Sequence, residues 1–183
     1  MTTRMEYARL PVGRCLERMQ RTANEIAAAI ADRSDPILSR RPQAASWAAK
    51  EVVCHLRDIE ELFMLRFRTM LALDDPIFLV LGEMPPDQAA WGIVDGDPLP
   101  LDPDRWAEER QYLRQDTGLA LAAFRRRREE TLALLGRLTP EQWKRGSIHV
   151  TLGRMTIADL VALIAAHDDK HLDQLRRALE GRS

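Results

Sequence analysis

The stretch LVALIAAHDDKHLDQL, residues 160–175, carries both a fold signal and a chemical signal. Its apolar residues recur with the period of an amphipathic helix. His167 and His171 lie on the same stripe, and a helix places residues at this spacing side by side. Two such imidazoles can bind one metal ion. The spacing by itself is weak evidence, because histidine pairs of this kind also occur as structural residues.

The helical period recurs in three other parts of the chain. Helices are predicted over 12–31, from Ser46 to about Leu73, from about Asp104 to Leu135, and from Ile157 to about Leu179. Thr139 begins a capping-box pattern that predicts a short helix near Trp143, and Ile148–Leu152 is expected to be extended. Almost no strand signal accompanies these segments. They predict an all-α four-helix bundle that forms a single domain over residues 1–183.

The connections between the helices constrain the topology. The modest link between the first two predicted helices allows them to be antiparallel neighbours. The link over 74–103 is long and holds most of the prolines. It can span the bundle, so the second and third helices can run parallel, and long links often cover a functional site.

A third histidine, His55, falls on the apolar stripe of the second predicted helix. The chain has only four histidines, and burying three of them without a shared reason is costly. We therefore interpret His55, His167 and His171 as a candidate metal site, with a structural core histidine as the alternative for each. Three histidine ligands leave a coordination position open, as in many catalytic zinc sites. Cys54 adjoins His55 but points about 100° away on a helix, so it is not expected to bind the same ion.

His149 lies before the fourth predicted helix, close to two glycines. It is either a turn residue or a fourth ligand. A closed site with four protein ligands would indicate a structural metal.

Other polar residues are candidates for supporting the histidines or for contacting a substrate. Glu51 lies one turn before His55, Asp168 adjoins His167, and Gln174 follows His171 by three residues. Each could accept a hydrogen bond from a ligand imidazole. The alternatives are solvated helix charges for Glu51 and Asp168, and an interhelical hydrogen bond for Gln174.

Two arginines fall on apolar stripes, Arg66 on the second predicted helix and Arg128 on the third. An inward arginine needs a carboxylate partner or an anionic ligand. We favour internal salt bridges for these arginines, with Glu51, Asp58 or Glu130 as partners, over a contact of one of them to the carboxylate of a substrate or thiol cofactor.

Composition excludes several other classes of function. The 183 residues carry a formal net charge of -1, which gives no basic surface for nucleic acid. The two cysteines form no disulfide framework and favour a reducing compartment. No signal peptide is evident, and no apolar run reaches the ~18 residues of a membrane span. We expect a cytoplasmic protein with neither nucleic acid nor membrane as partner.

Four stretches together resemble the DinB-like superfamily of metal-binding four-helix bundles. They cover most of residues 46–175 in the order found in that family: Ser46-Trp-Ala-Ala-Lys-Glu51-Val-Val-Cys-His55-Leu56, Phe124-x-x-x-Arg128-x-Glu130, His149-x-x-x-Gly153-x-x-Thr156 and His167-Asp168-x-x-His171-Leu-x-Gln174-Leu. The joint order of the four motifs makes the resemblance specific.

The resemblance implies an up-down-down-up bundle in which His55, His167 and His171 hold a divalent metal, either zinc or nickel. It also implies a homodimer and a small-molecule substrate. Activities in the superfamily include metal-dependent S-transfer with a low-molecular-weight thiol and metal-dependent hydrolysis. The sequence offers no HExxH glutamate as a base, which favours thiol chemistry or no chemistry. The alternative is a non-catalytic, metal-stabilised stress-response protein or a dimeric interaction module.

Overall fold

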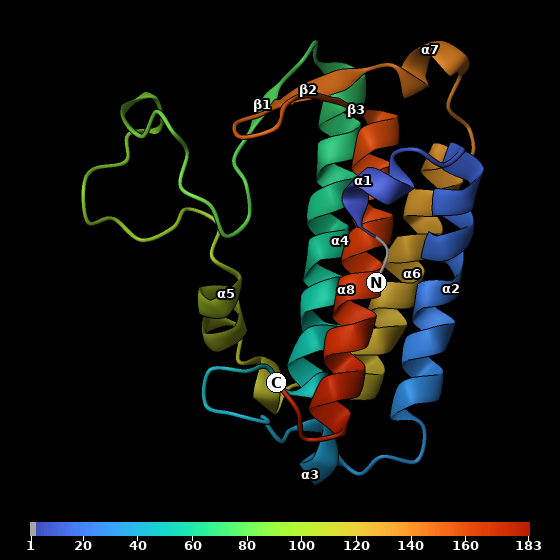
Figure 1. Cartoon of the computed structure of the whole chain (residues 1–183), viewed down its shortest axis with the longest axis vertical. Coiled ribbons are helices and arrows are strands. Elements are labelled where there is room, and N and C mark those ends of the chain that lie inside the picture. Colours follow the sequence, from blue (N-terminus) through green and yellow to red (C-terminus); the bar gives the residue numbers. More distant parts are fainter. Residues whose placement is uncertain (1–2) are drawn as a thin grey trace.

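The computed structural model describes residues 3–183, and four long helices dominate it (Figure 1). They are α2 (Val12–Ile30), α4 (Ala49–Ala72), α6 (Thr117–Leu135) and α8 (Ile157–Leu179). Short helices lie before and between them: α1 (Arg4–Tyr7), α3 (Asp35–Leu38), η1 (Ala89–Trp91), α5 (Pro103–Glu109), η2 (Tyr112–Arg114) and α7 (Pro140–Trp143). The prediction of a four-helix bundle is confirmed.

The four long helices are arranged in a ring. Both α2 and α4 pack against α6 and α8. In the view of Figure 1, α2 and α8 run downward, whereas α4 and α6 run upward. This is the up-down-down-up order, with α4 and α6 parallel because the long link returns the chain to the lower end. The expectation that the first two helices are neighbours is wrong, since α2 and α4 lie diagonally across the ring.

Apolar side chains from all four helices fill the bundle. One cluster includes Ile26, Val53, Phe124 and Leu175, and a second includes Phe67. Fully burying a side chain of this size contributes about 1.5–3 kcal/mol. The bundle therefore holds α4 and α8 in fixed register, which sets the positions of the histidines.

The start of α8 follows the prediction. The backbone N–H of Asp159 donates to Thr156 Oγ1 at 3.2 Å, and the N–H of Thr156 donates to the Asp159 carboxylate at 2.8 Å. This reciprocal cap satisfies donors that the first helical turn leaves free. Helix α4 begins later than predicted, because Glu51 accepts the N–H of Ala48 at 2.9 Å and Ser46 lies outside the helix.

The third predicted helix is interrupted. The structure has α5, η2 and α6 where one helix was expected from Asp104 to Leu135. Gln111 takes a left-handed conformation with φ of 50°, and Asp116 caps α6 by accepting the N–H of Leu119 at 2.7 Å. The break turns Tyr112 into the core, where its hydroxyl donates to Asp58 at 2.7 Å.

A small sheet covers the upper end of the bundle and was not predicted. Strand β1 (Ile77–Phe78) pairs in parallel with β2 (Gly146–His149), which pairs antiparallel with β3 (Gly153–Thr156). The extended segment expected at Ile148–Leu152 is therefore the end of β2 and a turn. Gly153 has φ of 73°, a conformation that favours glycine. Within residues 3–183, no helix is both long and apolar enough to cross a membrane.

Candidate metal centre

Helices α4 and α8 bring His55, His167 and His171 together. The Nε2 atoms of His55 and His167 lie 3.4 Å apart, and one ring nitrogen from each of the three residues lies within 4.8 Å of the others. Nitrogens bound to a tetrahedral zinc ion at about 2.0–2.1 Å would lie about 3.3–3.4 Å from each other. The 3.4 Å between His55 and His167 matches this value, and the nitrogen of His171 lies within 4.8 Å of the other two.

The protein environment keeps the three imidazoles neutral. Burial is the main cause that lowers the pKa of His55 and of His167 well below 6.5, and the adjacent His171 lowers both further. Burial also lowers the pKa of His171, to about 4. Neutral imidazole is the form that binds a metal. At neutral pH the cluster is thus ready to coordinate without first releasing protons.

Gln174 orients one of the candidate ligands. Its Oε1 atom lies 2.7 Å from Nδ1 of His171. Because a carboxamide oxygen only accepts, we assign the proton to Nδ1, which leaves Nε2 of His171 as the ligand atom. This contact agrees with the expectation that Gln174 could orient His171.

Replacing Gln174 by alanine is expected to weaken zinc affinity by about 10- to 100-fold, because His171 loses the acceptor that fixes its ring. Competition with a chromophoric chelator measures the dissociation constant. Gln174→Glu is the control, since it keeps an acceptor and should keep most of the affinity. An unchanged affinity in Gln174→Ala would show that this hydrogen bond does not support metal binding.

Aromatic rings enclose the cluster. The ring centroid of Trp47 lies 4.8 Å from that of His55 and 6.3 Å from that of His171, and Phe63 meets His167 edge-on at 6.0 Å. The Trp47 indole N–H donates to Asp104 at 2.8 Å. Trp47 lies in the connector before α4, so helical periodicity in the sequence does not mark it as part of the site.

Glu51 and Asp168 do not support the histidines. Glu51 pairs with Arg41, with Oε2 2.8 Å from the arginine Nε, and caps α4. Asp168 points away from His167 because adjacent helical residues diverge by about 100°. It accepts hydrogen bonds from Thr22 at 2.6 Å and from Arg128. Neither carboxylate contacts a candidate ligand, and both are buried, so they are neither supports of the histidines nor solvated helix charges.

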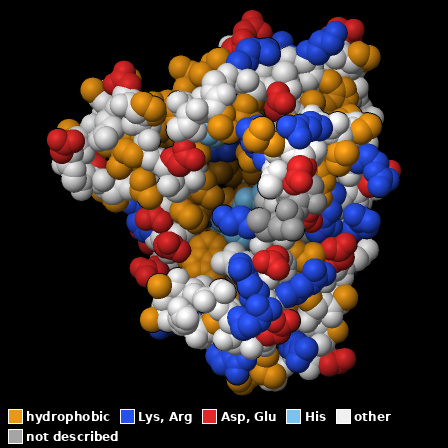
Figure 2. Space-filling model, in the orientation of Figure 1, with side chains coloured by type: hydrophobic (Ala, Val, Ile, Leu, Met, Phe, Trp, Pro, Cys, Tyr) orange, Lys and Arg blue, Asp and Glu red, His pale blue; other side chains and the backbone are white. Residues whose placement is uncertain are grey.

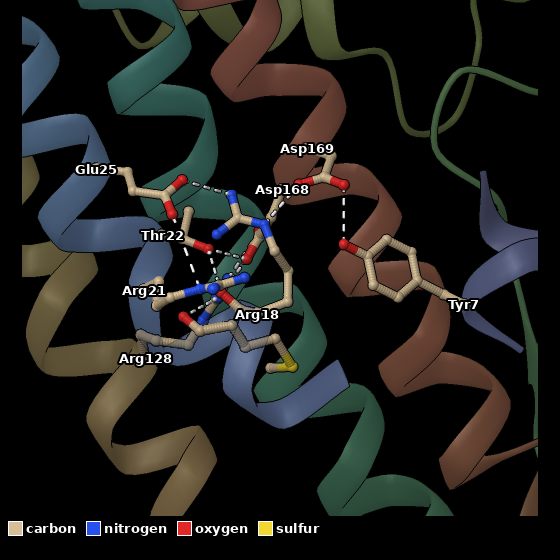
Figure 3. Close-up of polar contacts among 9 residues, drawn as sticks. Tyr7, Arg18, Arg21, Thr22, Glu25, Arg128, Asp168 and Asp169 are labelled. Carbon is tan, nitrogen blue, oxygen red and sulfur yellow. Dashed lines mark hydrogen bonds and ion pairs between the residues drawn. The ribbon is translucent and has the colours of Figure 1, made fainter. Parts of the chain in front are cut away.

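Arg128 forms an internal salt bridge, as favoured, but with other partners than expected. Its two Nη atoms lie 2.5 and 3.0 Å from the carboxylate oxygens of Asp168, and Nη2 lies 2.8 Å from Glu60. Nη1 also donates to the backbone oxygen of Met19 at 3.0 Å. Glu51, Asp58 and Glu130 are not its partners. This buried arginine ties together the four long helices and does not line the pocket beside the histidines. Figure 3 shows its contact with Asp168.

Asp169, the next carboxylate on α8, also contacts other helices and not the histidines. Asp169 accepts a hydrogen bond from the Tyr7 hydroxyl at 2.8 Å and from Arg18 Nε at 2.5 Å (Figure 3). Helix α8 is therefore fixed to α1, α2, α4 and α6 beside its two histidines. This network positions the ligand imidazoles without contacting them.

A pocket of about 780 Å³ lies beside the cluster, and all three histidines line it. Figure 2 shows it as a hollow with histidine at its base and apolar side chains along its wall. His149 lines the same pocket from the end of β2 but is not part of the three-histidine group. Cys54 is buried in the core, where burial raises its thiol pKa to about 11, and it is also outside the group.

The fold and the cluster together define a four-helix bundle with a three-histidine group of the kind that holds a divalent metal. A family model, described as the DinB superfamily, matches residues 18–175. The chain belongs to this superfamily.

Two known proteins are similar over most of their length. A protein of Oceanobacillus iheyensis, named "Putative metal-dependent hydrolase OB0413", is 23% identical over 168 residues, which cover 92% of this chain and 85% of that protein. Among solved structures, YfiT from Bacillus subtilis has a TM-score of 0.75 and 22% identity, with 94% of this chain and 89% of that chain covered. It is described as "a probable metal-dependent hydrolase with an unusual four-helix bundle topology". The likeness to YfiT supports the topology found here.

Proposed function

We propose that this protein is a metal-dependent enzyme in which His55, His167 and His171 hold one divalent ion. The observation that carries the proposal is the convergence of their ring nitrogens at the wall of a pocket large enough for a small-molecule substrate. Bound there, zinc or nickel would lower the pKa of a water molecule or a low-molecular-weight thiol toward neutrality. Three neutral ligands favour this effect because they leave the charge of the ion undiminished.

The residues around the histidines give the site its chemical setting. Gln174 fixes the ring of His171, and Trp47 and Phe63 restrict solvent around the other two rings. Exclusion of water strengthens electrostatic interactions within the site.

Hydrolysis is the first candidate reaction, because the names given to the two similar proteins both describe hydrolases. Thiol transfer is the second candidate reaction. The positions of the carboxylates around the pocket favour it. Among the described residues, the Asp and Glu side chains that line the pocket are Glu83 and Asp104. Both are exposed, and Asp104 is bonded to Trp47. Neither contacts a histidine of the cluster, so the site offers no evident carboxylate base for activating water.

The two reactions can be separated with one activated ester. Zinc- or nickel-loaded protein is expected to cleave p-nitrophenyl acetate, yielding acetate if water is the acceptor and an S-acetyl thioester if added 2-mercaptoethanol is the acceptor. Mass spectrometry of the products identifies the acceptor. His171→Ala should lose the metal-dependent part of the rate.

Metal-loaded protein that transforms neither this ester nor other thiol-conjugation and amidase substrates would contradict the proposal. It would favour the alternative of a non-catalytic metal-stabilised module. Homodimer formation and a cytoplasmic location stay predictions, which size-exclusion chromatography with light scattering and cell fractionation would test.

A further inference from the structure

The pocket has a second polar end, away from the three histidines. Arg66 of α4, His149 of β2 and Arg4 of α1 all line the pocket. Arg66 follows His55 by eleven residues, so it lies on the same face of α4 and about 16 Å further along the helix axis. Between the two ends, apolar side chains line the pocket: Ile59, Leu62, Phe63, Val80, Leu81 and Leu163.

Arg66 is a buried cation without a counter-charge. It is only 9% exposed, and its Nη2 donates to the backbone oxygen of Leu79 at 2.7 Å. Its guanidinium also lies 5.6 Å from the centroid of the Phe78 ring. Within residues 3–183 it has no carboxylate partner, in contrast to Arg128, which has two, so the internal salt bridge expected for Arg66 is not found. Burial lowers the pKa of Arg66 to about 10, so it remains charged at neutral pH.

His149 adds a hydrogen-bond donor at the same end. Its Nδ1 atom accepts the backbone N–H groups of Leu152 at 3.1 Å and of Thr151 at 3.3 Å. Nδ1 therefore carries no proton, and Nε2–H is a donor. Burial is the main cause that lowers the pKa of His149; the nearby Glu83 carboxylate raises this pKa, and the charges of Arg66 and Arg4 lower it by smaller amounts. Glu83 lines the pocket too, but it is exposed, and in the described part of the chain it forms no ion pair with Arg66.

We propose that Arg66 and His149 bind the carboxylate of an elongated substrate or thiol whose other end reaches the three histidines. A desolvated guanidinium without a partner is costly, and a carboxylate matches its planar fork of donors. The apolar wall between the two ends fits an unbranched or aromatic spacer. The inference rests on the proposed function for the chemistry at the far end, whereas the carboxylate site itself needs no metal.

The metal-independent arm of the test compares octanoate with octanamide on chelator-treated protein by calorimetry. Wild type is expected to bind octanoate about 10-fold or more tightly than octanamide, as a charge-assisted hydrogen bond would provide. Arg66→Met should remove this preference, and Arg66→Lys should retain part of it. Arg68→Met is the matched control, because Arg68 is exposed on the same helix, and it should behave as wild type. Circular dichroism checks that each variant is folded.

The second arm uses cobalt-loaded protein, in which thiolate coordination produces a charge-transfer band. We expect 8-mercaptooctanoic acid to give the band at lower concentration than its amide, and Arg66→Met should abolish this difference. 3-Mercaptopropionic acid is too short to span the pocket. This acid and its amide should therefore give the band at concentrations whose ratio is the same in wild type and in Arg66→Met.

The two arms keep the two proposals apart. Equal binding of octanoate and octanamide to wild type, or an octanoate preference that persists in Arg66→Met, would overturn the carboxylate site whatever the metal does. An octanoate preference that depends on Arg66, with no ester cleavage and no thiolate band in metal-loaded protein, would support the carboxylate site and contradict the proposed function.

Discussion

Replacing Arg128 by methionine is expected to lower the free energy of unfolding by about 3–5 kcal/mol, the loss typical of breaking a buried ion pair by removing one partner. The side chains of Arg128, Asp168 and Glu60 are all almost completely buried. Without the guanidinium, two carboxylates remain in the core with no cation to offset them. Oε1 of Glu60 already lacks a hydrogen-bond partner among the described residues, so Glu60 relies on Arg128. Chemical denaturation followed by circular dichroism measures the loss.

Arg126→Met provides the matched control for this experiment. Arg126 is exposed on the same helix, so the same substitution should change stability by less than about 0.5 kcal/mol. Adding Glu60→Gln to Arg128→Met should recover part of the loss, because it removes one of the unpaired charges. An unchanged melting temperature in Arg128→Met, accompanied by loss of ligand binding, would show that Arg128 serves a ligand instead of the fold.

Replacing His167 by alanine is expected to abolish stable metal binding. The site then keeps only two of its three imidazoles, and the loss should exceed the roughly 10- to 100-fold effect of removing a supporting hydrogen bond. Wild type purified without chelator, or loaded with zinc, should hold about one ion per chain. Elemental analysis after dialysis measures the content, and His55→Ala and His171→Ala should behave as His167→Ala does.

His149→Gln is the control for metal content. His149 lines the pocket but lies outside the three-histidine group, so this variant should keep the wild-type content. A loss in His149→Gln as large as that in His167→Ala would indicate a closed site with four protein ligands, which is the mark of a structural metal. Equal metal content in wild type and His167→Ala would exclude the assigned ligands.

The candidate site was largely predictable because its residues follow helical periodicity. His167 and His171 share a face at a spacing of four residues, and His55 lies on the apolar stripe of α4. Burial of that stripe turned all three imidazoles into the bundle, where they converge. Gln174 could be placed by the same spacing rule. Local sequence therefore contained most of the information about the histidine cluster.

Features that depend on partners distant in the sequence were not predictable in detail. The periodicity showed that Arg128 points inward, but its partners Glu60 and Asp168 lie on two other helices whose rotation only the packed bundle sets. The sequence alone could not identify Asp168 as the ion-pair partner of Arg128, because a hydrogen bond from the adjacent His167 to Asp168 was equally plausible. The carboxylate end of the pocket depends on β2, which has only four residues and no clear alternation of apolar and polar positions.

Two patterns in the sequence give opposite predictions for the segment just before α6. Asp116 is a good N-cap residue, but the apolar period continues through this region and favours one long helix. Tertiary packing decided between them, because burial of Tyr112 against Asp58 requires the chain to turn at Gln111.

X-ray absorption spectroscopy of the zinc-loaded protein tests the central claim most directly, because it identifies the atoms around the ion. We predict three imidazole nitrogens at about 2.0–2.1 Å and a fourth, exchangeable light-atom ligand, with no sulfur. Adding 2-mercaptoethanol should bring a sulfur to about 2.3 Å in that fourth position. Four protein imidazoles, a protein sulfur ligand, or a fourth position that no added thiol can enter would contradict an open three-histidine site.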